Sequence, residues 1–317
     1  MRAVVFAYHN VGCRCLSTLL AQGVEIPLVV THEDNPAEQI WFESVAALAR
    51  LHDIAVARPS DPNAPEFVAR VARLQPAFLF SFYYRQMLKP ALLGIPTRGA
   101  LNMHGSLLPR YRGRVPVNWA VIHGERQTGA TLHYMVERPD AGDIVSQQAV
   151  PILPDDTALE VFGKVTVAAE MALHRVLPAL LAGTAPRTPQ ELTQGSYYGG
   201  RRPEDGRIDW RRSAAEVHNL VRGVAPPYPG AFTEIEGKRV RVLRTTLPKE
   251  SPSPVGFPAL FCENGRCYAE CGDGRAVRIL SLEVDGKMLD SSSFERAGTT
   301  ARQPLTSSSP QLCSSST

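Results

Sequence analysis

Two polar residues with catalytic potential stand close together in the segment Asn102-Met103-His104-Gly105-Ser106-Leu107-Leu108-Pro109. Asn102 and His104 are two positions apart, so in an extended segment their side chains point the same way, with α-carbons about 6.5 Å apart. An amide and an imidazole facing one site suit a reaction that needs a hydrogen-bond donor and a proton carrier. Taken alone, this spacing is more often a strand end with two solvated side chains.

The loop after His104 favours the functional interpretation. It combines three turn formers, Gly105, Pro109 and Gly113, with three arginines, Arg110, Arg112 and Arg114. A tight turn lined by guanidinium groups is typical of a site that handles a polar or anionic ligand.

A working histidine is commonly oriented by a carboxylate, so a third residue is expected. Glu137, Asp140 and Asp143 are the candidates, in a turn that Pro139 and Gly142 favour. The same pattern fits a turn with solvated acids. The spacing alone does not choose among the three carboxylates.

The elements that must position these residues alternate between strand and helix patterns. Apolar strands are predicted at 3–7, 26–30, 78–82, 99–103, 130–136 and 144–150. Helices are predicted from Gly12 to Gln22, from the Asp34-Asn35-Pro36 cap to about Leu51, and at 65–74, 116–123 and 156–182. This order predicts an α/β, Rossmann-like domain with a largely parallel sheet, whose ligands bind beyond the carboxyl ends of the strands.

The second half of the chain has a different pattern. Residues 184–203 are rich in proline, glycine and polar residues and are predicted to form a linker between a first domain, 1–183, and a second, 204–297. Ser213 and Glu216 form a capping box before a helix that runs to about Val224. Turn pairs at 236–237, 264–265 and 273–274 predict a small OB-like antiparallel barrel. Residues 298–317 are serine-rich and predicted to be disordered.

The composition is that of an ordinary globular protein: 44% hydrophobic and 21% charged residues, with a formal net charge of +3. We predict a cytoplasmic protein, because the sequence starts with a strand pattern and no apolar run approaches the ~18 residues of a membrane helix. Cys262, Cys267 and Cys271 lack the C-x-x-C spacing of zinc sites, so reduced thiols and no metal are expected.

The stretch NMHGSLLPRYRG, followed by RPDAGDIV, resembles the folate-dependent formyltransferase family, in which N-x-H-x-S-L-L-P and a later aspartate form the site. The resemblance extends over roughly residues 1–297. It implies that Asn102, His104 and Asp140 are catalytic and that 10-formyltetrahydrofolate is the co-substrate. Segments such as THEDNP, FSFYYR and PPYPGAF are most similar to members that formylate UDP-4-amino-4-deoxy-L-arabinose in lipid A modification and polymyxin resistance.

The resemblance also implies binding residues. The folate pocket is expected to include Gln86, Met87, Leu88, Arg114, Val136, Glu137, Arg138, Pro139 and Asp140. Tyr84 is a candidate for stacking on a ring of a substrate, and Arg201 and Arg202 are candidates for a diphosphate. Core packing is the competing explanation for the apolar residues, and a solvated linker pair for the arginines.

The expected chemistry is attack of an uncharged amine on the formyl carbon, with negative charge developing on the formyl oxygen. Asn102 and a cationic His104 are the expected donors to that oxygen, and Asp140 favours the cation. The direction of each proton step stays open.

Other acceptors and functions compete with this interpretation. A tRNA acceptor needs a basic insertion, whereas residues 31–38 are acidic; the basic residues Lys238, Arg239, Arg241 and Arg244 keep that alternative open. A non-enzymatic OB-type nucleic-acid binder and a formyl hydrolase are the remaining alternatives. We expect small-molecule partners, no nucleic acid and no membrane; a homo-oligomer is compatible with the sequence.

Overall fold

A computed structural model describes residues 1–36, 38–235, 237–250, 252, 256–289 and 303–305. The chain forms two compact units. Unit 1 comprises residues 1–120, 126–152 and 160–200, and unit 2 comprises 121–125, 153–159 and 201 onward. The expected linker is divided between them, because residues 184–200 belong to unit 1 and residues 201–203 to unit 2.

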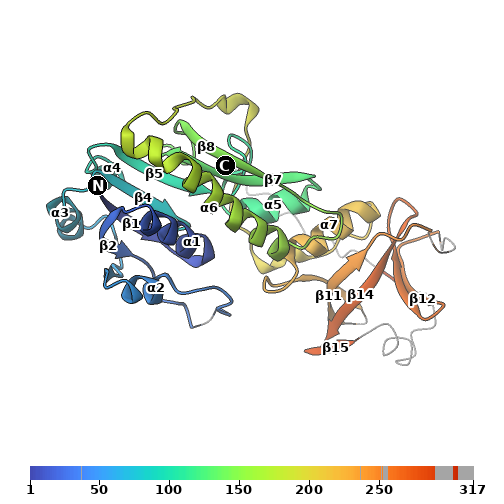
Figure 1. Cartoon of the computed structure of the whole chain (residues 1–317). Helices are drawn as coiled ribbons and strands as arrows, with labels where there is room; N and C mark the ends of the chain where they lie inside the picture. The colour runs from blue at the N-terminus through green and yellow to red at the C-terminus, as the bar shows by residue number, and fades with distance from the viewer. Residues whose placement is uncertain (37, 236, 251, 253–255, 290–302, 306–317) are drawn as a thin grey trace, which may run out of the picture. The chain divides into compact units, whose positions relative to one another are not determined.

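Unit 1 is built on a seven-stranded sheet in the order β3-β2-β1-β4-β5-β7-β8 (Figure 1). The first five strands of this order are parallel, and β7 and β8 are antiparallel to their neighbours. The bounds are β1 Arg2–Ala7, β2 Glu25–Val30, β3 Ala55–Ala57, β4 Phe78–Phe82, β5 Gly99–His104, β7 Gln127–Tyr134 and β8 Ile144–Pro151. All residues of β4 are buried, as expected for a strand covered on both faces of the sheet.

The helices of this part are α1 His9–Ala21, α2 Val45–Leu51, α3 Pro65–Arg73, α4 Pro90–Leu93, α5 Pro116–Ile122 and α6 Ala158–Ala182. α1 and α6 lie side by side, as Figure 1 shows, and Arg14 of α1 forms an ion pair with Glu170 of α6. A small two-stranded parallel sheet, β6 Arg112–Gly113 with β9 Tyr197–Tyr198, and a 3-10 turn at Leu192–Gln194 complete the unit.

The helix expected from Asp34-Asn35-Pro36 was placed too early, because α2 begins only at Val45. The helix cap is Ser44, whose side chain accepts a hydrogen bond from the Ala47 amide. Asp34 instead accepts a hydrogen bond from the Tyr8 hydroxyl at 2.7 Å. The Asp34 side chain therefore contacts Tyr8, and no helix starts at this position.

α6 is long and apolar enough to cross a membrane by length and composition, and no other helix of the described residues meets that test. It is the helix predicted at 156–182, and it is not a continuous apolar run, because it carries Glu160, Lys164 and Glu170. Half of its apolar window is buried inside the protein, which is the pattern of a core helix.

Unit 2 contains a helix and an antiparallel sheet. α7, Ala214–Val224, starts with the expected capping box between Ser213 and Glu216. The strands are β10 Ala231–Ile235, β11 Lys238–Thr246, β12 Ala259–Glu263, β13 Arg266–Glu270, β14 Ala276–Val284, β15 Lys287–Leu289 and β16 Gln303–Pro304. Their order is β10-β11-β14-β13-β12-β16, with β15 beside β14.

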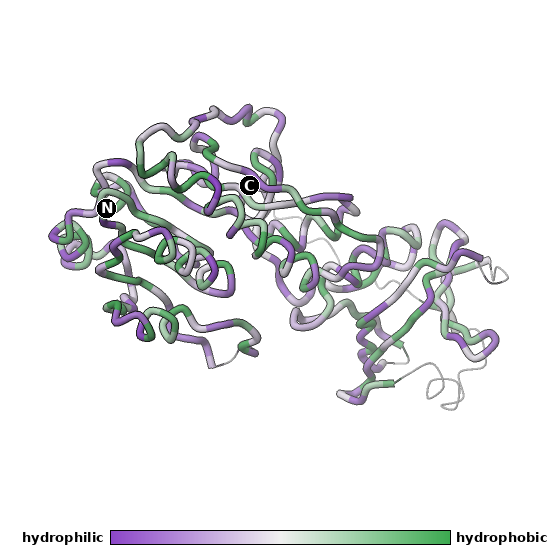
Figure 2. Tube along the Cα trace, viewed as in Figure 1, coloured by the Kyte–Doolittle hydropathy of each residue, from purple (hydrophilic) through white to green (hydrophobic). Residues whose placement is uncertain are grey.

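The core of unit 2 lies between α7 and its sheet, around Trp210, which is 1% exposed. Figure 2 shows hydrophobic residues recurring along the strands of both units. The fold prediction is confirmed as a Rossmann-like domain followed by an antiparallel β domain. Most of the tail predicted to be disordered lies outside the described residues, although Gln303–Pro304 pairs with β12.

Candidate active site

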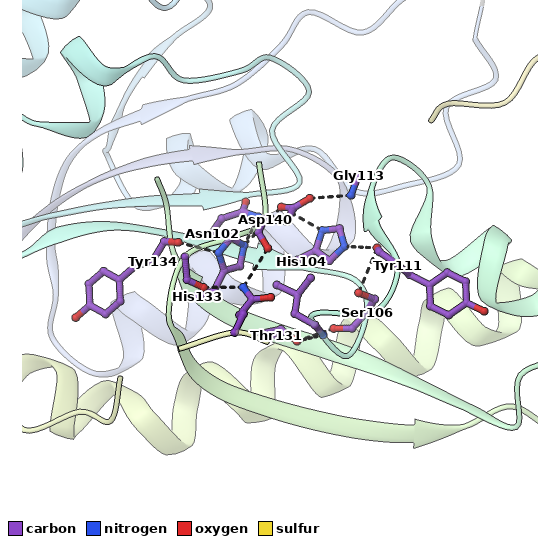
Figure 3. Close-up of polar contacts among 12 residues, drawn as sticks. Asn102, His104, Ser106, Tyr111, Gly113, Thr131, His133, Tyr134 and Asp140 are labelled. Atoms are coloured by element: carbon purple, nitrogen blue, oxygen red, sulfur yellow. Dashed lines mark hydrogen bonds and ion pairs between the residues drawn. The ribbon is translucent and has the colours of Figure 1, made fainter. Parts of the chain in front are cut away.

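β5 and β7 together position the polar residues of the site. Asn102 and His104 lie on β5, and the antiparallel register of β7 places His133 opposite Asn102 and Thr131 opposite His104. Asp140 comes from the loop between β7 and β8. Figure 3 shows the side chains of Asn102, His104, His133 and Asp140 converging. The structure therefore brings together the three residues proposed as catalytic.

His104 is 6% exposed and lies between two hydrogen-bond acceptors. Its Nε2 donates to the backbone carbonyl of Tyr111 at 2.8 Å, and its Nδ1 lies 3.6 Å from Oδ1 of Asp140. A carbonyl and a carboxylate can only accept at these two nitrogen atoms. The surroundings thus suit a ring that carries hydrogen on both nitrogens.

Asp140 is held by groups that favour its ionised form. Its Oδ2 accepts a hydrogen bond from the Gly113 amide at 2.8 Å, and its Oδ1 lies 3.6 Å from both His104 and His133. Burial by itself raises the pKa of Asp140, but the His104 imidazole and the Gly113 amide outweigh burial and hold that pKa well below its usual range. Asp140 is therefore an anion throughout the ordinary pH range.

His133 is a member of the site that the sequence reasoning missed. It is 1% exposed, its Nδ1 donates to the Tyr134 carbonyl at 2.8 Å, and its Nε2 lies 3.1 Å from the amide nitrogen of Asn102. With its hydrogen on Nδ1, the ring accepts from Asn102 and fixes the orientation of that amide. Only the antiparallel register of β7 could have revealed this residue.

The turn after His104 is anchored to β7 by buried hydrogen bonds. The Thr131 hydroxyl donates to the carbonyl of Ser106 and accepts from the amide of Leu108 at 3.2 Å. Gln147 of β8 donates to both the Thr131 hydroxyl and the Leu108 carbonyl, at 2.9 and 2.8 Å. Thr131 is completely buried. These bonds explain how a sharp turn stays in place beside His104.

The expected folate residues after β4 lie beyond the carboxyl end of a strand that is paired in parallel with β5. Met87 is 59% exposed, which leaves its side chain accessible to a ligand. Leu88 is 7% exposed and packs in the core, as the competing interpretation expected. The side-chain amide of Gln86 is held by two hydrogen bonds, since it donates to the Ser60 carbonyl at 3.0 Å and accepts from the Tyr84 hydroxyl at 3.2 Å.

The second group of expected folate residues surrounds Asp140. Arg114 and the side chains of Val136, Glu137 and Arg138 are exposed, and Pro139 is partly buried. Val136 lies two residues after the end of β7 at Tyr134. These positions are compatible with a ligand surface next to Asp140.

The substrate candidates have separate environments. Tyr84 is half-buried, stacks on His32 with ring centroids 4.1 Å apart, and has a pKa raised to about 12 by burial. Arg201 and Arg202 belong to unit 2, where the Arg201 guanidinium donates to the Asp205 carbonyl at 2.7 Å. Tyr84 thus fits core packing as well as stacking, and the arginines stay candidates on sequence grounds.

The cysteines and acids within the described ranges offer no cluster for a metal. Among the residues that the structure describes, no group of three or more His, Cys, Asp or Glu side chains is placed to hold a metal ion. Cys267 and Cys271 are buried, and burial raises the pKa of both thiols well above the usual range, which disfavours thiolates.

Comparison with solved structures shows the same fold in sugar N-formyltransferases. An N-formyltransferase from Helicobacter canadensis, in complex with folinic acid and dTDP-3-aminofucose, matches with a TM-score of 0.70 and 18% identity over 88% of this chain and 98% of that one. WlaRD, a sugar 3N-formyl transferase studied with dTDP and 5-N-formyl-THF, matches with a TM-score of 0.69 and 17% identity over 90% of this chain and 98% of that one. A sugar N-formyltransferase from Shewanella sp. FDAARGOS_354 matches with a TM-score of 0.63 and 20% identity over 78% of this chain and 99% of that one.

The family comparison covers both units of the chain. Residues 2–177 match the family described as formyl transferase, and residues 201–297 match the formyl transferase C-terminal domain. The first match alone spans more than half of the 317 residues and contains all four side chains that converge beside β5. We conclude that this chain is an enzyme of the formyl transferase family.

Proposed function

We propose that this enzyme transfers a formyl group from 10-formyltetrahydrofolate to the amine of a nucleotide-linked amino sugar, with UDP-4-amino-4-deoxy-L-arabinose as the first acceptor to test. The observation that carries the proposal is the buried network of Asn102, His133, Asp140 and His104 in a chain of this family. An arabinose product of this kind belongs to lipid A modification, which is the biological role that we propose.

The reaction balances without any further reagent. The amine nitrogen bonds to the formyl carbon, and the bond from that carbon to N10 of the folate breaks. The amine loses one proton and N10 gains one, so the products are a formamide and tetrahydrofolate. Catalysis then requires stabilisation of the oxygen charge and a route for one proton.

The residues divide these tasks according to their surroundings. Asn102, oriented by His133, and His104, flanked by two acceptors, are the donors for the developing oxyanion. Donors of this kind contribute about 3–4 kcal/mol to transition-state stabilisation. Because the pKa of Asp140 is low, its carboxylate keeps a negative charge that stabilises cationic His104. For the same reason Asp140 is a weak base and a poor acceptor for the proton that the amine loses.

Two observations support the choice of substrates. The exposed side chains of Met87 and Val136 and the exposed Arg114 provide apolar and cationic contacts for a carrier. The solved relatives were studied with folate derivatives and with dTDP-3-aminofucose or dTDP. A nucleotide-linked amino sugar is therefore the acceptor class that we propose.

The test is a turnover assay with 10-formyltetrahydrofolate and either UDP-4-amino-4-deoxy-L-arabinose or dTDP-3-aminofucose, followed by mass spectrometry of the sugar nucleotide. We expect the arabinose product to gain one formyl group, and His104→Ala to abolish the gain. His52→Ala is the matched control, because His52 is exposed and its ring makes no hydrogen bond among the described residues.

Other outcomes separate the parts of the proposal. Formylation of dTDP-3-aminofucose alone would reject the arabinose acceptor and keep the acceptor class. Carrier loss without a heavier sugar in either case would reject the acceptor class. Absence of carrier loss with a folded protein would overturn the proposed use of folate.

A further inference from the structure

We propose that residues 187–200, here called the strap, position both loops of the active site, and that Gln190 is the positioning residue for Asp140. The inference rests on the proposed function only for its kinetic consequences. All residues involved belong to unit 1. The sequence had suggested a linker here, so a catalytic contribution from this segment goes beyond that expectation.

The first part of the strap holds the loop that carries Asp140. Thr188 pairs with Ile144, the first residue of β8, through two backbone hydrogen bonds of 2.8 and 2.9 Å. Arg187 lies over the ring of Tyr134 at 4.0 Å and contacts Asp143 at 3.3 Å. The strap therefore contacts this loop both before the turn, at Tyr134, and after it, at Asp143 and Ile144.

Gln190 makes the contacts closest to the catalytic carboxylate. Its side-chain amide donates to the carbonyls of Asp140, at 3.0 Å, and Gly142, at 2.6 Å. Its Oε1 is buried without a hydrogen-bond partner among the residues that the structure describes. Leaving that oxygen unpaired costs free energy, so the two donated bonds are what explain the placement of the side chain.

The conformation of Asp140 explains why such a clamp is needed. Its φ angle is +53°, in the left-handed region that non-glycine residues rarely adopt. A residue in that region persists only when its surroundings determine the conformation. The Gln190 amide and the Gly113 amide, which binds Oδ2, hold its backbone and its carboxylate respectively.

The second part of the strap holds the loop that accepts from His104. The Ser196 hydroxyl accepts from the amide of Tyr111 at 2.8 Å, and the carbonyl of the same Tyr111 accepts from His104. The amides of Arg112 and Arg114, on either side of Gly113, donate to the carbonyls of Ser196 and Tyr198 at 2.9 Å. The strap thus fixes the peptide groups that touch His104 and Asp140.

Aromatic stacking fastens the end of the strap. The ring of Tyr198 stacks on Tyr111 and on Trp119, with centroids 5.4 and 5.2 Å apart. The Trp119 indole donates to the carbonyl of Gly199 at 3.0 Å. Because contacts hold both ends and the middle of the strap, it supports the loops that contact His104 and Asp140 as one unit.

The test compares Gln190→Glu with Gln194→Glu, the same chemical change within the strap at an exposed side chain without a hydrogen bond among the described residues. In Gln190→Glu the carbonyls of Asp140 and Gly142 lose their donor and face a carboxylate instead. Because these groups repel one another, we expect the turn that carries Asp140 to shift. We expect kcat for formyl transfer to fall about 100-fold, as for a displaced catalytic group, with the KM for 10-formyltetrahydrofolate within about twofold of the parent value. Gln194→Glu is expected to behave as the parent protein.

Ser196 provides a second, independent variant. Ser196→Ala removes the acceptor of the Tyr111 amide and is expected to lower kcat, whereas Ser196→Thr retains a hydroxyl and is expected to restore it. An equal loss in both variants, or losses that only follow the melting temperature, would show a merely structural role and overturn the positioning proposal.

A measurement without substrate separates this proposal from the proposed function. Nitrogen-15 NMR of histidine-labelled protein at one fixed pH, with the His104 signals identified by their loss in His104→Gln, reports the surroundings of that ring. We expect the His104 ring signals to shift in Gln190→Glu and not in Gln194→Glu, even if the acceptor proves to be a different one. Unchanged His104 signals in Gln190→Glu overturn the proposal.

Discussion

His133 faces Asn102 across the antiparallel pair β5–β7, with its Nε2 3.1 Å from the amide nitrogen of Asn102. The Nδ1 of the ring is occupied by the Tyr134 carbonyl, so Nε2 is left to receive the amide hydrogen. An asparagine side chain can turn its oxygen and nitrogen around, and this contact decides which of them faces His133. Asn102 then has its second amide hydrogen available for the contact with the formyl oxygen that we propose.

We therefore predict that His133→Phe lowers kcat by about 10- to 100-fold, because it leaves the partly buried Asn102 amide without this acceptor and without a fixed orientation. His133→Gln restores part of the activity, since its side chain can present an acceptor. Steady-state kinetics on both variants, with His52→Gln as the exposed control, check the prediction. Equal activity of His133→Phe and the parent protein would rule out this orienting role.

Asp140 gives a prediction for stability at acid pH. Its pKa in the folded protein is lowered, so its ionised form stabilises the fold above its ordinary pKa, about 3.9, and this contribution is lost as pH falls below that value. Asp140→Asn lacks the contribution. Urea unfolding at pH 6 and pH 3 is expected to show the parent protein losing more stability than the variant, and a parallel loss in both would contradict the lowered pKa.

The same residue gives a prediction for activity. Asp140→Asn keeps the shape but removes the charge that stabilises cationic His104, so we expect kcat to fall by about 10²- to 10⁴-fold. In the parent protein, Asp140 stays ionised between pH 5 and 9, and no change of rate in that range should come from its titration. The pH profiles of the parent and the variant, measured with saturating substrates, test both statements.

His9 gives a second prediction for stability at acid pH. As for Asp140, its contribution to the free energy of unfolding is lost as pH falls, but over a different pH range. Burial, aided by Arg85, lowers the pKa of His9 to about 3, and the ring stacks on Phe42 with centroids 4.0 Å apart. A histidine that is neutral when folded stabilises the protein above its ordinary pKa of about 6.5, and the contribution falls as pH drops toward 3. His9→Asn, which tolerates the φ of +69°, is expected to flatten the decline of unfolding free energy between pH 7 and pH 5.

Thr131 gives a prediction for the turn after His104. Thr131→Val leaves the Ser106 carbonyl and the Leu108 amide without a bond to this side chain in a completely buried position. Each unpaired buried group costs about 1–3 kcal/mol, so we expect a loss of about 2–4 kcal/mol in unfolding free energy. Thr131→Ser retains the hydroxyl and should lose much less. Chemical denaturation of the two variants provides the comparison.

Much of the architecture was predictable from local patterns. The apolar run at 78–82 predicts a strand covered on both faces, and β4 is completely buried. The Ser213 and Glu216 pair predicts the start of α7, because a capping box depends only on residues three positions apart. The start of α2 was not predictable, since Asp34 bonds to Tyr8, a residue 26 positions earlier in the chain.

The sequence by itself determined the types and the spacing of the residues around Asn102 and His104, because two residues on one strand share a side whatever the rest of the chain does. The resemblance to a known family singled out Asp140 among the three carboxylates, whereas the tertiary structure alone decided that His133 faces Asn102, since that contact depends on the register of β7 against β5. The tertiary structure also turned residues 187–200 from an expected linker into a part of unit 1. Hydrogen bonds between residues some 50 to 85 positions apart, such as Gln190 to Asp140 and Ser196 to Tyr111, form only when the folded sheet brings their partners together.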